Sequence, residues 1–316
     1  MREKKALRDA FGEAIVKLGE RDERVVVLTG DLESSTRLTE FKKRWPERFF
    51  QLGVAEQNMV GVAAGLALAG KVPFVCSFAT FLSRAWEQIR VTVCLNRLGV
   101  KLVGSHAGLS HPQDGATAQA TEDVALMRSL PGIAVVVPAD AREMGEAVAA
   151  VAEREGPVYL RMTREPTPIF TDGGFEIGKA KVLREGEAVS LIGAGPILAE
   201  VLKAAEILEK RGVEAEVVGV GTIKPLDEEA VVRSARKTGR VVTVEDHQVF
   251  GGVGGAVAEV LGRRCPVAMK MIGLKDEFGT TAREYGRLLA RFGLDGEGIA
   301  RAVEEWMGKS VVTPGV

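Results

Sequence analysis

The stretch from Phe49 to Gly70, FFQLGVAEQNMVGVAAGLALAG, organises the rest of the chain. A single carboxylate, Glu56, precedes a run of small apolar residues, and residues 59–70 carry no charge. This run is too short to cross a bilayer, and its glycines favour close packing between helices. We therefore expect a buried helix over residues 54–69 with Glu56 in its first turn.

Glu56 is the first candidate for chemistry. A carboxylate that enters a buried helix loses its hydration, which is strongly unfavourable unless another group takes its proton or its charge. The alternative is structural, with backbone N–H groups of the first helical turn satisfying the carboxylate. The rest of the chain has to decide between these two interpretations.

The composition is that of a globular protein of about two domains, since the chain has 316 residues and is 46% hydrophobic and 27% charged. The net charge of −1 gives no reason to expect binding to nucleic acid or to a membrane surface. Three widely spaced cysteines and the lack of a signal-peptide pattern predict reduced thiols in a cytoplasmic protein.

Apolar runs alternate with helical patterns along both halves of the chain, which predicts an α/β protein of two doubly wound domains. We place the first domain at residues 1–165, a linker at 166–186 and a smaller domain at 187–316. The expected strands are 25–28, 72–76, 100–104, 133–137, 158–161, 188–192, 215–218, 241–244 and 267–270. The expected helices are 5–19, 54–69, 121–130, 141–152, 197–210, 227–237, 251–261, 282–291 and 295–307.

Polar residues follow two of the expected strands. Asp31 and Ser35 come after strand 25–28, and His106 and Asp114 come after strand 100–104. Ligands of open α/β sheets bind beyond the carboxyl ends of the strands, so these side chains are site candidates. No third ligand stands at a metal-binding spacing from the histidines of this loop, and we predict no metal site in the chain.

Three aromatic residues lie within nine positions in a chain that is only 5% aromatic: Phe78, Phe81 and Trp86. They could form the wall that a flat ring needs, although core packing explains such clusters as well. Two glycine-rich loops give weaker signals. The loop at 193–196 lacks the third glycine of a dinucleotide fingerprint, and the loop at 251–255 lacks the lysine of a P-loop.

Taken together, these segments resemble thiamine-diphosphate enzymes of the transketolase group. The segment at 53–59 resembles the one that carries their catalytic glutamate, and the segment at 77–88 resembles the one that lines the aminopyrimidine ring. The motif DGATAQ at 114–119 and the segment at 130–140 are similar to the same group. The resemblance covers the chain in order, and it implies a pyrimidine-binding domain followed by a transketolase C-terminal-type domain.

Full-length members of this group bind the diphosphate through Mg²⁺ in a preceding domain with a Gly-Asp-Gly signature. That signature does not occur here. The resemblance therefore implies the C-terminal subunit of a split transketolase, which moves a two-carbon ketol unit between phosphosugars. A partner N-terminal subunit would supply the diphosphate and metal site, and two copies of each chain would form a heterotetramer.

The resemblance also implies roles for individual residues. Glu56 would hydrogen-bond N1′ of the aminopyrimidine, a task that suits a carboxyl group whose pKa is raised by burial. Phe78, Phe81 and Arg84 would border the ring. Asp31 would lie near the cofactor and the sugar hydroxyls. His106 would contact the sugar and would be catalytic together with Glu56. Sugar hydroxyls would meet Asp114, and the sugar phosphate would meet Ser35 and Arg164.

One residue departs from the family pattern, because Ala118 stands where members commonly have a histidine. The departure leaves the donor sugar open, and His111 lies outside the usual register. Three alternatives remain: a beta-type subunit of a 2-oxo acid decarboxylating dehydrogenase, an enzyme like deoxyxylulose-phosphate synthase, and an assembly subunit without catalysis.

Overall fold

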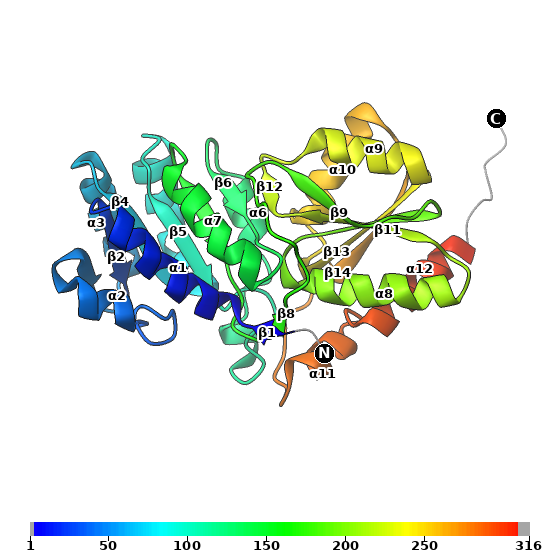
Figure 1. The fold of residues 1–316 in the computed structure, drawn as a ribbon, viewed down its shortest axis with the longest axis horizontal. Coiled ribbons are helices and arrows are strands. Elements are labelled where there is room, and N and C mark those ends of the chain that lie inside the picture. The colour runs from blue at the N-terminus through cyan, green and yellow to red at the C-terminus, as the bar shows by residue number, and fades with distance from the viewer. Residues whose placement is uncertain (1–2, 309–316) are drawn as a thin grey trace.

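The computed structural model describes residues 3–308, which form two α/β domains lying side by side (Figure 1). The predicted fold class is confirmed. The outer ends of the two expected domains, residues 1–2 and 309–316, lie outside the described residues. Within residues 3–308, every helix is too short or too polar to cross a membrane.

The first sheet has seven strands in the order β12-β6-β7-β5-β4-β2-β3, and all but β12 run parallel. Its strands are β2 (Val25–Thr29), β3 (Phe49–Gln51), β4 (Val72–Phe78), β5 (Lys101–Ser105), β6 (Ala134–Val136), β7 (Val158–Arg161) and β12 (Thr222–Lys224). The second sheet has five strands in the order β14-β13-β10-β11-β9. Its strands are β9 (Ala180–Arg184), β10 (Val189–Gly193), β11 (Ala215–Val220), β13 (Arg240–Gln248) and β14 (Ala268–Leu274).

Helices cover both faces of each sheet, as the continuous apolar strands predict. In the first domain these are α1 (Leu7–Arg21), α2 (Thr39–Arg44), α3 (Glu56–Leu68), α6 (Asp123–Arg128) and α7 (Ala141–Glu153). The second domain has α8 (Leu198–Lys210), α9 (Glu228–Thr238), α10 (Val253–Arg264), α11 (Tyr285–Arg291) and α12 (Gly296–Gly308). Strand β2 shows the two-sided burial, because Val25 and Val27 join one core cluster while Val26 and Leu28 join the other.

The segment at 166–186 is more ordered than the linker expected there. Strand β8 (Thr167–Pro168) pairs with β1 (Lys4–Lys5), and β9 pairs antiparallel with β11 of the second sheet. Strand β12 comes from the second half of the sequence but pairs with β6 of the first sheet. These short strands depend on partners far along the chain, so local periodicity does not reveal them.

Helix α3 begins at Glu56, two residues later than expected, because Gly53 has φ of +70° and Ala55 is not helical. It ends in a left-handed Gly70 whose N–H donates to the Ala67 carbonyl at 3.0 Å. The expectation of a fully buried helix is wrong for the single chain. Gly61, Gly65 and Leu68 are exposed, the last by 75%, so α3 presents an uncovered apolar face.

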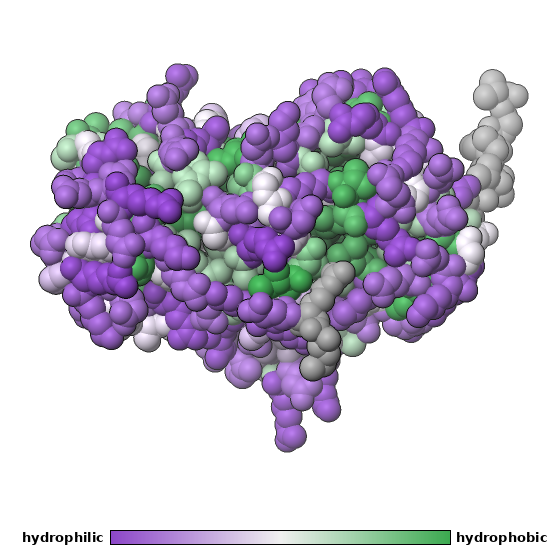
Figure 2. Space-filling model, viewed as in Figure 1, coloured by the Kyte–Doolittle hydropathy of each residue, from purple (hydrophilic) through white to green (hydrophobic). Residues whose placement is uncertain are grey.

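Residues 79–94 form several short helical turns rather than one regular helix. These are α4 (Ala79–Leu82), a 3₁₀ turn (Ser83–Ala85), α5 (Trp86–Gln88) and a π-helical segment (Ile89–Cys94). The Trp86 indole N–H donates to the Leu126 carbonyl at 3.2 Å, so this aromatic packs into the protein. Figure 2 shows a mostly hydrophilic surface on one face, with apolar residues gathered where the domains meet.

Gly104 of β5 is required by the packing of Tyr159, which is fully buried on the neighbouring strand. A Cβ atom on Gly104 would lie 2.2 Å from the Tyr159 hydroxyl oxygen. We expect Gly104→Ala to lower the free energy of unfolding by about 1–3 kcal/mol through overpacking, measured by urea denaturation. The control is Gly145→Ala on the exposed side of α7, where a Cβ meets nothing within 4 Å. A control variant as unstable as Gly104→Ala would contradict this explanation.

Candidate active site at the carboxyl edge of the first sheet

The candidate residues gather at one edge of the first sheet. Strands β2, β4, β5 and β7 are parallel neighbours, so their carboxyl ends lie together. Asp31 follows β2, the aromatic segment follows β4, His106 follows β5 and Arg164 follows β7.

Glu56 lies at the N-terminus of α3 with its side chain 2% exposed. One carboxylate oxygen accepts a long hydrogen bond from the Ser77 hydroxyl at 3.4 Å, and the other lies 3.8 Å from the Arg84 guanidinium. Gly30 allows the close approach of the backbone that leads into α3, because a Cβ there would lie 2.8 Å from the Gly53 carbonyl oxygen. Both contacts of Glu56 are long, and the carboxylate keeps the capacity to bind another donor.

Four rings form a continuous aromatic and imidazole wall beside Glu56. Phe78 stacks on Phe81 with ring centroids 5.1 Å apart, and on His106 with centroids 3.8 Å apart. His111 packs edge-on against Phe78 at 5.9 Å. The Arg84 guanidinium lies 5.8 Å from the Phe81 ring. The wall therefore joins two expected groups, the ring-binding and sugar-binding residues.

His106 is buried and has a positive φ of +57°, which is unusual for a residue with a side chain. Burial lowers the pKa of His106 to about 2, and the neighbouring His111 ring and the Arg8 and Arg164 guanidinium groups act in the same direction. The imidazole is therefore neutral, and its Nδ1 lies 2.8 Å from the Ser105 hydroxyl. A neutral imidazole can donate or accept one hydrogen bond towards a hydroxyl group.

His111 belongs to the same cluster, although the sequence offered no firm reason to include it. Arg164 Nη1 lies 2.9 Å from His111 Nδ1, and His111 Nε2 lies 3.1 Å from an Asp114 carboxylate oxygen. Because arginine only donates, Nδ1 accepts and Nε2 carries the proton. Burial lowers the pKa of His111, which agrees with this neutral tautomer.

Two arginines that the sequence did not single out also lie at this edge. Arg8 of α1 donates to the Ser35 carbonyl at 3.3 Å, and Arg37 follows two residues after Ser35. The pKa of Arg8 is lowered by burial and then by Arg37 and Arg164, which shows that the three charges are neighbours. Helix α1 has no motif around Arg8, so only the fold reveals this basic cluster.

Asp31 and Ala118 complete the set of expected positions. Asp31 is exposed with φ of +64°, and its N–H donates to Gln51 Oε1 at 2.7 Å. Ala118 is buried after the 3₁₀ turn Gly115–Thr117 and offers no polar group to the site.

The described residues suit part of a thiamine cofactor. A buried carboxylate with long contacts, next to an apolar ring wall, matches the needs of an aminopyrimidine. Among residues 3–308, no group of three or more His, Cys, Asp and Glu side chains is arranged to hold a metal ion.

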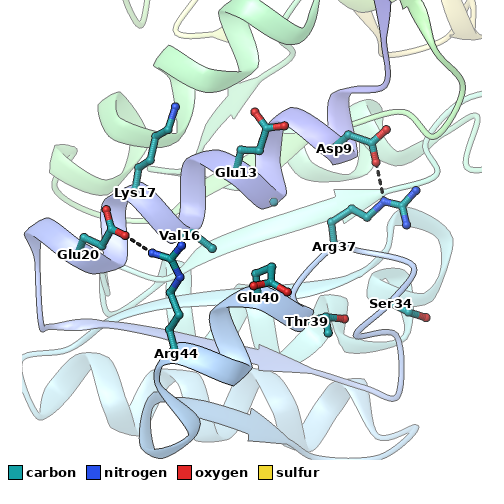
Figure 3. Close-up of a pocket in the computed structure, with 11 residues that line it drawn as sticks. Asp9, Glu13, Val16, Lys17, Glu20, Ser34, Arg37, Thr39, Glu40 and Arg44 are labelled. Atoms are coloured by element: carbon teal, nitrogen blue, oxygen red, sulfur yellow. Dashed lines mark hydrogen bonds and ion pairs between the residues drawn. The ribbon is translucent and has the colours of Figure 1, made fainter.

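A separate groove of about 620 Å³ lies between α1 and α2, as Figure 3 shows. Its charged side chains are largely paired with each other: Arg37 lies 2.5 Å from Asp9, and Arg44 is paired with Glu20. These pairs leave little unsatisfied charge for a ligand, and the groove does not include Glu56 or His106. We do not assign it a function.

Two protein families match this chain. The transketolase pyrimidine binding domain matches residues 3–168, and the transketolase C-terminal domain matches residues 178–299. The boundary between the two matches lies within the segment that contains β8 and β9.

Known proteins of similar length agree with this match. The putative transketolase C-terminal section of Methanocaldococcus jannaschii is 45% identical over 96% of this chain and 97% of its own length. The 6-deoxy-6-sulfo-D-fructose transketolase subunit SqwH of Clostridium sp. is 42% identical over 95% of this chain and 94% of its own length. A solved structure described as a split gene transketolase, inactive beta4 tetramer, has a TM-score of 0.88, 45% identity and coverage of 95% and 97%. The chain therefore belongs to the transketolase family and corresponds to its pyrimidine-binding and C-terminal domains.

Proposed function

We propose that this protein is the C-terminal subunit of a cytoplasmic split transketolase, which transfers a two-carbon ketol unit between phosphosugars with thiamine diphosphate. The observation that carries the proposal is the buried Glu56 carboxylate beside the Phe78–Phe81–His106 wall. An N-terminal subunit with the diphosphate-binding domain completes the site and holds Mg²⁺.

When bound, thiamine diphosphate would supply the nucleophilic carbon for ketol transfer, and the protein would supply position and electrostatics. Glu56 holds a proton shared with N1′ of the aminopyrimidine, and its burial at 2% exposure keeps water from competing for that hydrogen bond. Phe78 and Phe81 border the ring and exclude water, and Arg84 lies at the open side. Asp31 extends from the loop after β2 towards the same edge.

The sugar binds at the end of the wall formed by the two histidines. His106 presents a neutral imidazole to sugar hydroxyls, together with the exposed Asp114 carboxylate, which His111 holds through its Nε2. Arg164 and Ser35 receive the sugar phosphate, and Arg8 adds a second guanidinium beside Ser35. Guanidinium groups suit this task because they bind phosphate oxygens in pairs. His111 lies within this cluster, but both of its ring nitrogens are already paired, with Arg164 and with Asp114, so Ala118 leaves one sugar contact of the family unreplaced.

The apolar face of α3 supports self-association. Gly61, Gly65 and Leu68 are exposed, and Cβ atoms on the two glycines would meet nothing within 4 Å. A helix face without large or charged side chains allows close approach of a second helix. We propose that two copies pack through this face, and that two N-terminal subunits complete a heterotetramer.

The role of Glu56 is tested with Glu56→Gln in the complex reconstituted with the N-terminal subunit. We expect kcat to fall about 100-fold or more, because the amide cannot share a proton with N1′. Ketol transfer between phosphosugars is measured with thiamine diphosphate and Mg²⁺ present. Glu47→Gln, which changes an exposed carboxylate, should leave the rate unchanged.

Full activity of Glu56→Gln would contradict the proposed role of this residue. Pyruvate consumption without ketol transfer by the unmodified complex would favour a 2-oxo acid decarboxylating subunit. Cofactor binding without any turnover would favour an assembly subunit.

The neutral state of His106 predicts a pH dependence of stability. The unfolded chain binds a proton at this imidazole below about pH 6.5, whereas the folded chain, with a pKa of about 2, does not. The unfolded state therefore binds more protons, and the free energy of unfolding falls as the pH is lowered below about 6.5. In His106→Gln, the free energy of unfolding should fall less steeply with decreasing pH, and the slope should be smaller by up to about 1.4 kcal/mol per pH unit. Urea unfolding of both proteins between about pH 7.5 and about pH 5.5 measures the two slopes. The same pH dependence of the free energy of unfolding in both proteins would contradict the prediction.

Self-association through α3 is tested with Gly61→Glu. The new carboxylate lies on an open face of the single chain, so we expect the fold to persist and the sedimentation coefficient to fall to that of a smaller species. Gly262→Glu on α10, also with no neighbour within 4 Å of its Cβ, is the matched control. An unchanged sedimentation coefficient of Gly61→Glu would show that α3 is not part of the interface between copies.

A further inference from the structure

The loop at 106–121, which carries His106, His111 and Asp114, is held from the second domain. The Gln248 N–H donates to the Thr121 carbonyl at 2.6 Å, and the Gln248 side chain donates to the Thr121 hydroxyl at 3.1 Å. Further along the loop, the Ala282 N–H donates to the Pro112 carbonyl at 2.8 Å. These contacts join the first domain to the last residue of β13 and to the segment that follows β14.

Gln119 links His111 directly to the second domain. Its side chain is 4% exposed, and its single NH₂ group donates to the His111 carbonyl at 3.2 Å and to the Thr280 carbonyl at 3.1 Å. One amide thus ties the loop to itself and to the second domain. Gly279 permits this, because a Cβ there would lie 1.8 Å from Gln119 Oε1.

The backbone around His106 needs such support. A side-chain-bearing residue with φ of +57° is in a sparsely populated conformation, which persists only when surrounding contacts determine it. The Ala107 N–H donates to Met162 and the Gly108 N–H donates to Ala120, at 3.2 and 2.7 Å. Gly108 also packs on β13, since a Cβ there would lie 2.0 Å from an Asp246 carboxylate oxygen.

We infer that Gln119 is a positioning residue through which the second domain holds the His111–Asp114 turn, and so sets the affinity for the sugar substrate. The inference rests on the proposed function, and it gives the second domain a role in substrate binding. Glu56, Phe78 and Phe81 lie outside these contacts, so cofactor affinity does not depend on Gln119.

The alternative is ordinary packing between domains, in which Gln119 only contributes to overall stability. The two explanations differ in where the effect of a substitution lies. A positioning role makes residues 108–118 more dynamic and weakens sugar binding. A packing role lowers stability throughout both domains and leaves the sugar KM of the folded protein unchanged.

Gln119→Met tests the inference, because methionine keeps the length of the side chain but cannot donate. In this chain alone, we expect amide hydrogen exchange of residues 108–118 to accelerate at least tenfold, with exchange in β4 and β5 unchanged. In the complex reconstituted with the N-terminal subunit, the KM for the phosphosugar donor should rise about tenfold. The kcat and the dissociation constant of thiamine diphosphate should stay within about twofold.

Gln248→Ala is the second variant. Gln248 is only partly buried, and its replacement removes the side-chain bond to the Thr121 hydroxyl but keeps the main-chain bond to the Thr121 carbonyl, so smaller changes in the same direction are expected if Gln119→Met does not fold. Arg211→Met is the control, since it breaks exposed ion pairs to Glu297 and Glu304 within the second domain and does not touch the loop.

Unchanged exchange in residues 108–118, exchange accelerated equally in both domains, or an unchanged sugar KM in folded variants would each overturn the inference. Failure of the proposed function is distinguishable from these outcomes. It would appear as no ketol transfer by the unmodified complex, while the hydrogen exchange result would still decide whether Gln119 holds the loop.

Discussion

The buried Arg161 guanidinium connects the two domains and the loop above them. It donates to Asp123 at 2.9 Å within the first domain and to Asp246 of β13 at 2.8 Å in the second. All three side chains are at most 3% exposed. Two carboxylates against one guanidinium leave a net negative charge in the interior, and burial raises the pKa of Asp246. Removing the arginine would leave both buried carboxylates without a cationic partner, so the fold depends strongly on it.

This network explains why the site lies at the domain boundary. Tyr159 donates to the same Asp123 carboxylate at 2.6 Å, directly below Gly104 of the strand that leads to His106. From the other side, Asp246 packs against Gly108, two residues beyond His106. The buried charges thus determine the path of the chain that carries the imidazole wall. Glu56 lies apart from this network, at the start of a helix whose outer face is open.

Much of the fold was predictable because its strands are long apolar runs. The parallel strands β2, β4, β5 and β7 lie within about two residues of their expected positions. Helix α9 begins within a residue of its expected start, because the Asp227 carboxylate caps it by accepting from the Ala230 N–H. The short strands β3, β8, β9 and β12 were not predicted, because each is stabilised by a partner strand rather than by its own sequence.

The sequence alone determined the fold class and most of the candidate site, since loops that follow parallel strands must meet at one edge of the sheet. His106 could be named for that reason. Glu56 was named from the start of an apolar helix, and Phe78 and Phe81 from an aromatic cluster, each together with the resemblance to a known family. Tertiary structure decided what local patterns cannot encode: Arg8 and Arg37 approach Arg164, and His111 joins the site. Only the fold shows that one face of α3 is exposed. The hydrogen bonds between the second domain and the 106–121 loop likewise join residues that are distant in the chain.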